Sequence, residues 1–177
     1  MNEEKNVHRI RAAIDETDDA ILRLIERRIA LACEMADAKP SGQGHSPLRP
    51  ARESSILERL NHRAAGASER LIEVIWRELI GQGRQAQGSM RLLLFTRENH
   101  GLFEECARRH FGSAIPVEWV DSREAALRAA REQPAIAVLD VQVEDPDLTP
   151  LGQIKTLAGE PVAFAFARIV SQEKLQG

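Results

Sequence analysis

Cysteines and long apolar segments are scarce in this sequence of 177 residues. The two cysteines, Cys33 and Cys106, lie far apart and form no CxxC or paired Cys/His spacing, so neither a disulfide framework nor a zinc site is expected. No apolar run approaches the roughly 18 residues that a membrane helix needs. The first residues are charged, unlike those of a signal peptide. We therefore expect a cytoplasmic protein with no membrane span.

A basic excess is also missing. The formal net charge is −3 and the pI is about 6.0, and this balance argues against nucleic-acid binding. The catalytic motifs GxSxG, HExxH, GxGxxG and the P-loop do not occur. The histidines are scattered, at His8, His45, His62, His100 and His110. These absences predict a site that acts by binding and electrostatics, with no metal and no cofactor.

A long amphipathic helix is predicted from about residue 3 to residue 39. One stripe of this segment recurs at alternating steps of four and three residues, a spacing that keeps side chains on one face of a helix. Its members are Val7, Arg11, Ile14, Asp18, Ile21, Ile25, Arg28, Ala32, Met35 and Lys39. At about 1.5 Å per residue the helix is roughly 55 Å long. A stripe of this length needs a partner chain or a coiled-coil neighbour.

Three bases share this stripe with one acid. Arg11, Arg28 and Lys39 are matched only by Asp18, and an unpaired charge removed from water costs several kcal/mol. An anionic ligand would supply the missing negative charge. The alternative is that the Arg and Lys stems pack along the seam while their charged ends reach water.

Two shorter helices are expected to add polar groups to the same site. Pro50 suits the first turn of a second helix, and Arg52 and Glu53 follow it in that turn. A third helix, with Ser68 as its expected cap, ends its apolar stripe on Gln87. Together with the three bases of the first helix, these groups could clamp a small dianion. Taken alone, the Arg-Glu pair would be a solvated surface pair and the glutamine a frayed helix end.

Three segments carry a recognisable pattern, namely RAAIDETDDAILRLIERRIALACEMADAK, ARESSILERL and IWRELIGQGRQAQ. In order they contain an Arg that opens the first helix, I-D-x-x-D, E-R-R, a helix-ending Lys, an R-E pair and a closing Gln. Through these segments, residues 7–87 resemble the all-helical class of chorismate mutases. The resemblance implies an intertwined homodimer whose long first helices pair. It also implies the rearrangement of chorismate to prephenate in the biosynthesis of Phe and Tyr.

The resemblance further implies a role for each candidate residue. Arg28 would hold a carboxylate, together with Arg11 donated by the other subunit. Lys39 would contact a carboxylate and the ether oxygen, and Gln87 would donate a hydrogen bond to the same ether oxygen. Glu53 would accept a hydrogen bond from the ring hydroxyl.

Arg52 would support Glu53 and add a positive electrostatic field to the site.

Two positions depart from the family pattern. Leu48-Arg49-Pro50 stands where some relatives have an acidic residue, and Gly83 stands where some have a serine. At these positions a backbone N–H or a water molecule would have to replace a hydrogen bond to the ligand.

After Gly88 the sequence changes to short apolar strands that alternate with helices. Strands are predicted at 91–95, 117–120, 136–141 and 162–170, and helices at 102–111, 123–132 and 151–157. This alternation is typical of βαβ units, so we expect a small α/β lobe with a mainly parallel sheet. The fold class is therefore α + α/β, with a three-helix domain at 1–88, the lobe at 90–170 and a tail at 171–177.

The segment GLFEECARRHFGSAIPVEWVDSREAALRAAREQPAIAVLDV faintly resembles the first lobe of prephenate dehydratase. The GPxGTFS, ENS and T-R-F signatures are missing and the lobe is too short for a two-lobed enzyme, so no dehydratase activity is expected. The lobe could bind an effector, aid dimer packing or be a relic. Two alternatives to a mutase stay open: isochorismate pyruvate-lyase, which resembles the same helical fold, and a non-catalytic dimeric module that senses a metabolite.

Overall fold

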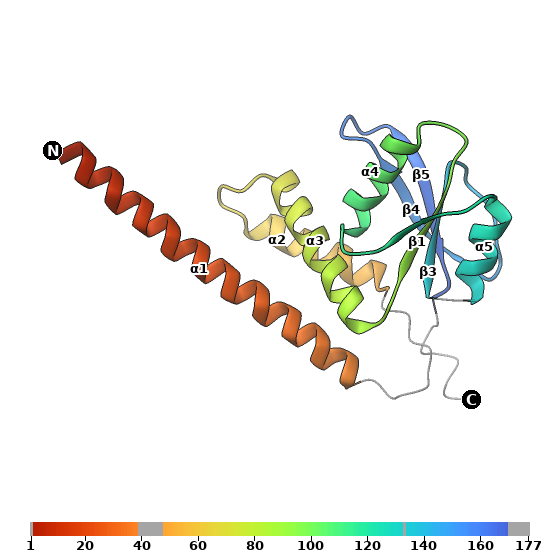
Figure 1. Cartoon of the computed structure of the whole chain (residues 1–177), viewed down its shortest axis with the longest axis horizontal. Coiled ribbons are helices and arrows are strands. Elements are labelled where there is room, and N and C mark those ends of the chain that lie inside the picture. Colours follow the sequence, from red (N-terminus) through yellow and green to blue (C-terminus); the bar gives the residue numbers. More distant parts are fainter. Residues whose placement is uncertain (1, 39–47, 133, 170–177) are drawn as a thin grey trace.

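The computed structural model describes residues 2–38, 48–132 and 134–169. Three helices come first, α1 (Asn2–Asp37), α2 (Pro50–Arg63) and α3 (Glu69–Gln87). A sheet of five strands with two helices follows: β1 (Arg91–Phe95), α4 (His100–Phe111), β2 (Val117–Trp119), α5 (Arg123–Glu132), β3 (Ala135–Leu139), β4 (Thr149–Lys155) and β5 (Pro161–Ala167). Figure 1 shows α2 and α3 between α1 and the α/β lobe. Among the described residues, no helix is long and apolar enough to cross a membrane.

Local signals set the helix ends. Pro50 occupies the first turn of α2, where its missing N–H is not needed. Ser68 caps α3 as predicted, because its hydroxyl oxygen accepts a hydrogen bond from the Leu71 N–H at 3.2 Å. α1 ends at Asp37. The predicted last residue of this helix, Lys39, lies outside the described residues.

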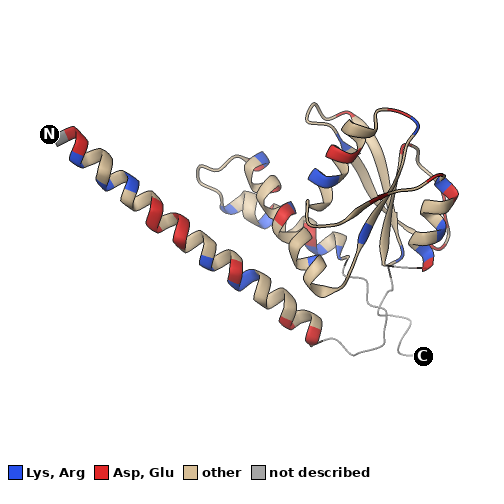
Figure 2. Ribbon diagram, in the orientation of Figure 1, with Lys and Arg blue, Asp and Glu red and all other residues tan. Residues whose placement is uncertain are grey.

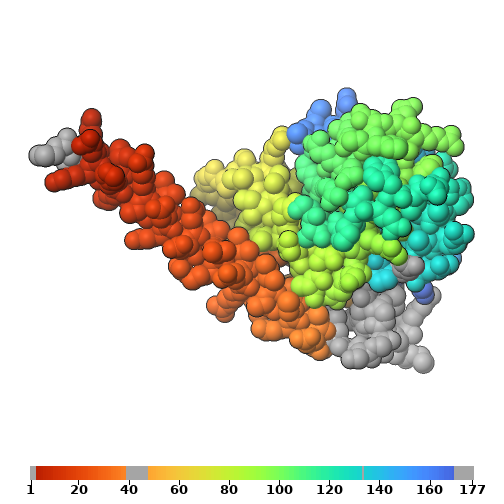
Figure 3. All heavy atoms as spheres, in the orientation of Figure 1, coloured from red at the N-terminus to blue at the C-terminus, as the bar shows by residue number. Residues whose placement is uncertain are grey.

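α1 buries little of its apolar stripe within the protomer. Its C-terminal half packs on α3 through half-buried side chains, among them Ile25, Arg28 and Ala32. Farther towards the N-terminus, Ile14 and Ile21 are about half exposed (53% and 50%). Figures 1 and 3 show this part of the helix as an arm that extends away from the remainder of the molecule. In the single chain this part of the stripe is therefore left largely uncovered.

The sheet is mixed, with strand order β2-β1-β3-β5-β4. β1 pairs parallel with β2 and with β3, whereas β5 pairs antiparallel with β3 and with β4. The predicted mainly parallel sheet is therefore wrong. The segment 151–157, predicted as a helix, belongs largely to β4, which forms an antiparallel hairpin with β5. Pro150 and Gly152 (φ 111°) are poor helix formers and favour this extended course.

Each face of the sheet has its own apolar core. Leu92 and Leu94 of β1 pack with Phe103 of α4 on one face. Leu93 points to the other face, where it packs with Leu127 of α5. The alternation follows from the period of two along a strand. Because helices cover both faces, the central strands are buried throughout, as expected for this architecture.

The helical part packs directly against the lobe. Leu48, just before α2, is 1% exposed and lies in the same core as Leu92. α3 also approaches the C-terminal end of α4 closely, because a Cβ atom on Gly81 would lie only 2.7 Å from the Phe111 carbonyl oxygen. Gly112, at φ 93°, ends α4 at this crossing. The two glycines thus permit a tight junction that a larger residue would prevent.

Candidate active site

A cavity of about 740 Å³ lies among α1, α2 and α3. Four of the six predicted site residues line it, namely Arg28, Arg52, Glu53 and Gln87. Arg28 comes from α1, Arg52 and Glu53 from the first turn of α2, and Gln87 from the end of α3, so three helices bring them to one space. Apolar side chains, including Trp76 and Ile80, line the same cavity. Its size and mixed lining suit a small organic ligand.

The other two predicted residues are not part of this lining. Arg11 is exposed, and it precedes Arg28 by 17 positions, about 25 Å along a helix. It cannot reach the cavity of its own protomer without leaving the helix. Lys39 lies outside the described residues, so its position relative to the cavity is still a prediction.

Arg28 is held against α3. One of its N–H groups, on Nη1, donates a hydrogen bond to the Leu79 carbonyl oxygen. Burial lowers the pKa of its guanidinium from the ordinary value, although arginine stays a cation at physiological pH. Within the described residues its other N–H groups make no hydrogen bond. The guanidinium is thus held through Nη1 and retains other N–H donors for an anionic ligand.

Gly83, one of the two departures from the pattern of the mutases, lies beside Arg28. A Cβ atom there would lie 3.4 Å from the Ala32 Cβ and 3.9 Å from Arg28 Nη1. Both are ordinary contact distances, so the packing of α3 on α1 would also accommodate a small side chain here. Its carbonyl oxygen accepts a hydrogen bond from Gln87 Nε2 at 3.1 Å. This bond uses one of the two N–H groups of that amide and fixes its nitrogen end at the cavity.

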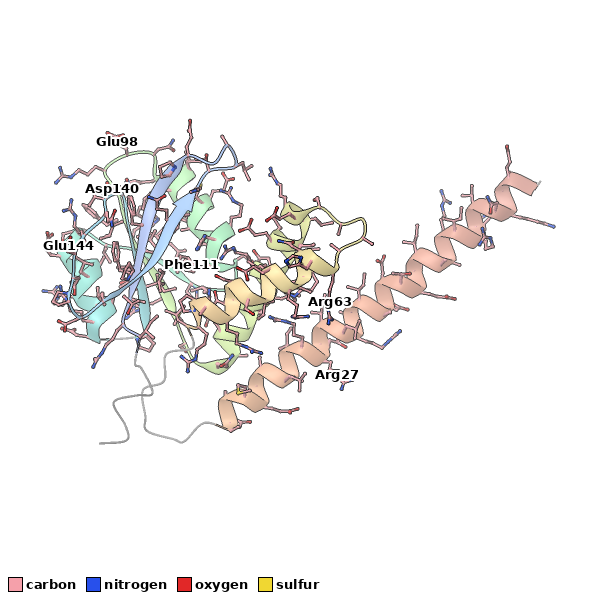
Figure 4. All side chains as sticks on the ribbon, turned by 180° about the vertical axis from the view of Figure 1, so that it is seen from behind. Arg27, Arg63, Glu98, Phe111, Asp140 and Glu144 are labelled. Atoms are coloured by element: carbon pink, nitrogen blue, oxygen red, sulfur yellow. The ribbon has the colours of Figure 1, made fainter. Side chains whose placement is uncertain are left out.

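Arg84 is the main site residue that the sequence analysis missed. It is 4% exposed, and its Nη2 forms an ion pair with Glu53 Oε2 while its Nε donates to Oε1 at 3.2 Å. Its Nη1 donates to the Phe111 carbonyl oxygen at 3.3 Å, and the guanidinium carbon lies 5.6 Å from the centre of that ring. One side chain therefore connects the carboxylate of the cavity to the end of α4. Figure 4 shows Phe111 at the side of the lobe that faces the helices.

Arg77 supports Arg84 at the junction with the lobe. It stands seven residues before Arg84 and so lies on the same face of α3. Its Nη1 donates to the His110 carbonyl oxygen at 3.2 Å. The two arginines thus bind adjacent carbonyl groups at the C-terminal end of α4, where the helix dipole favours cations.

The cavity has a strong excess of positive charge. Of the described residues that line it, one is an acid, Glu53, and five are cations, Arg28, Arg49, Arg52, Arg59 and Arg84. In Figure 2 basic residues appear on α1 and on the helices facing it. Within the described ranges, His, Cys, Asp and Glu side chains form no group of three that could hold a metal ion. The arrangement can bind an anion and stabilise negative charge that develops on it.

Residues 10–88 match the family model of chorismate mutase type II. The matched segment is somewhat less than half of the chain and contains most of α1 with all of α2 and α3, the helices that form the cavity. No curated protein and no solved structure matches the chain. The resemblance of the lobe to prephenate dehydratase has no support from a family model.

Proposed function

We propose that this protein is a chorismate mutase, an isomerase that rearranges chorismate to prephenate for aromatic amino acid biosynthesis. The cationic cavity within the segment that matches the type II family supports this proposal most directly. Chorismate carries two carboxylates, which match the excess of arginine side chains. We assign catalysis to the helical domain at 1–88 and treat the lobe at 90–170 as a separate unit.

The reaction suits a site whose described lining offers cations and an amide. It is a unimolecular rearrangement, so the enzyme needs to hold the compact reactive conformer. It also needs to stabilise the negative charge that grows on the ether oxygen as the C–O bond breaks. Neither task requires a covalent intermediate or a proton transfer.

In this proposal Arg28 binds a carboxylate with the N–H groups that its bond to Leu79 leaves available. Gln87 donates an amide N–H to the ether oxygen, and Lys39 binds the same oxygen and a carboxylate. Glu53 accepts a hydrogen bond from the ring hydroxyl. Its carboxylate has about four lone-pair sites, so it can accept this bond while it pairs with Arg84. Arg52 adds positive field.

We further propose that the active form is a homodimer in which the α1 helices pair. The half-exposed stripe on the N-terminal arm, including Ile14, Ile21 and Leu24, supports this assembly. Pairing would bury that stripe and would bring Arg11 of each protomer to the cavity of its partner. In this dimer Arg11 acts at the cavity of the partner, so its distance from the cavity of its own protomer is no obstacle to a role in binding.

A paired assay tests the activity against its alternatives. Purified protein is incubated separately with chorismate and with isochorismate, and prephenate and pyruvate are measured in both. The proposal predicts prephenate from chorismate, with little pyruvate from isochorismate. Predominant release of pyruvate would instead identify an isochorismate pyruvate-lyase. Binding of chorismate without turnover of either compound would identify a non-catalytic metabolite sensor.

A further inference from the structure

A second cavity, of about 390 Å³, lies between the helical part and the lobe. It is lined by α3, α4 and the end of the β4–β5 hairpin. The α3 residues on this cavity are offset from those on the first by about a quarter of a turn, at 100° per residue. Arg70 and Arg77 face the second cavity, whereas Ile80 and Gln87 face the first. The two spaces are therefore neighbours separated by one helix.

Positive charge dominates this second cavity as well. Among the described residues, four cations line it, Arg70, Arg77, Arg109 and Lys155, against one acid, Glu73. A second acid, Glu105, pairs with Arg109 at 3.6 Å from outside the lining. They come from three separate elements, so the fold gathers charges that are distant in the sequence. Like charges brought together are unfavourable without a counter-charge, and the cost falls when an anion binds between them.

Two of these cations are already positioned by the protein. Arg77 binds Glu73 Oε1 at 3.0 Å and the His110 carbonyl oxygen at 3.2 Å. Arg109 Nη2 donates to the Lys155 carbonyl oxygen at 2.6 Å, which ties α4 to the hairpin. Such bonds hold the guanidinium groups in place before any ligand arrives, and this reduces the entropy lost on binding.

The side chains of the other two cations, Arg70 and Lys155, are not held in place by such bonds. Within the part of the chain that the structure describes, neither the Arg70 guanidinium nor the Lys155 ammonium has a hydrogen-bond or ion-pair partner. Both are exposed. They are therefore available to an incoming anion.

The remaining lining gives the cavity shape and polarity. The hairpin turn is ordered by Thr156, whose hydroxyl oxygen accepts hydrogen bonds from Ala158 N and Glu160 N, each at 3.2 Å. Burial, together with nearby Arg77, lowers the pKa of His110 to about 3, so its ring is neutral at physiological pH. Val74 and Leu157 supply apolar surface, which suits the carbon skeleton of a metabolite better than a bare ion.

We propose that this second cavity is a binding site for a small metabolite with at least two negatively charged groups, distinct from the chorismate site. Arg77 and Arg109 are its fixed cations, and Arg70 and Lys155 are the exposed cations that bind the ligand beside them. The proposal does not depend on the mutase activity, because it concerns residues outside the first cavity.

Isothermal titration calorimetry on the full chain tests the site at constant ionic strength, because salt screens exposed charges. Citrate serves as the carboxylate probe and pyrophosphate as the phosphate probe. We expect saturable binding of at least one probe. The double variant Arg70→Gln/Lys155→Gln should weaken it about tenfold or more, as expected when charge-assisted contacts are lost. Both side chains are exposed, so the variant should fold.

Two matched variants locate the binding. Arg52→Gln removes a cation from the first cavity, and Arg128→Gln removes an exposed cation of α5 that lines neither cavity. Both should bind the probe as the wild type does. The proposal is overturned if neither probe saturates up to about 10 mM, if the double variant binds normally, or if Arg52→Gln abolishes binding. No chorismate is present, so the result is independent of turnover.

Discussion

The buried ion pair between Arg84 and Glu53 makes a strong prediction about Arg84→Met. Methionine keeps much of the length and apolar contact of the side chain but removes every N–H donor. Glu53 and the Phe111 carbonyl oxygen then lose their partner. Removal of one member of a buried pair typically costs about 3–5 kcal/mol. The side chain of Glu53 is 15% exposed, so water can reach it in part and we expect the lower end, about 3 kcal/mol.

In a protein of this size, about 3 kcal/mol corresponds to a fall in Tm of roughly 6–12 °C. Urea denaturation at fixed protein concentration measures the free energy of unfolding, since assembly makes stability concentration-dependent. Arg59→Met is the matched control, an exposed arginine of the same cavity that should change stability by only about 0.5 kcal/mol. The double variant with Glu53→Gln should lose less than the sum of the single losses. A loss below about 1 kcal/mol for Arg84→Met, or strict additivity, would refute this reasoning.

Three further predictions concern other groups. Burial lowers the pKa of His110 to about 3 in the folded protein, whereas a histidine in the unfolded chain titrates near 6.5. Below pH 6.5 the wild type should therefore lose about 1.4 kcal/mol of unfolding free energy per pH unit relative to His110→Gln, and an equal pH dependence of the two proteins would contradict this prediction. Gln87→Ala should lose roughly 2.7–4 kcal/mol of transition-state stabilisation, mainly in kcat, and a kcat near that of the wild type would show that Gln87 does not act in the site. Gln87→Glu should shift the rate optimum towards acid pH, because only the protonated carboxyl group can donate a hydrogen bond. Arg11→Ala and Lys39→Ala chains, each inactive alone, should regain part of their activity when mixed, because one site of the mixed dimer keeps both side chains; sedimentation as a stable monomer would exclude this arrangement.

Much of the fold could be predicted because its elements have strong local periods. The segments assigned to β1 and α5 coincide with the predicted ranges. The hairpin was not foreseen, because Leu151, Ile154 and Leu157 recur every three residues and imitate one face of a helix. In the structure only Ile154 of these three is buried, and Leu157 is 57% exposed. Because the segment of β4 was predicted as a helix, its antiparallel hairpin with β5 was not expected, and the sheet was predicted to be mainly parallel.

The candidate site could be predicted in part from helical phase, which placed Arg28 on the apolar stripe, and in part from the resemblance to the mutases, which singled out Glu53 and Gln87. In the structure these three residues line one cavity. Arg84 was missed because an arginine near the end of a helix is usually solvated. Its burial depends on Phe111, which lies 27 residues farther along the chain, and no local pattern reports such a contact.

The rate of prephenate formation by the purified full chain tests the central claim most directly. Chorismate at millimolar concentration is followed in parallel with wild type, with Arg28→Ala and without protein. We predict rapid, saturable formation of prephenate by the wild type and a rate reduced by at least tenfold in the variant, since Arg28 binds a carboxylate through charge-assisted hydrogen bonds. A wild-type rate equal to that of the solution without protein would contradict the assignment of this cavity to chorismate rearrangement.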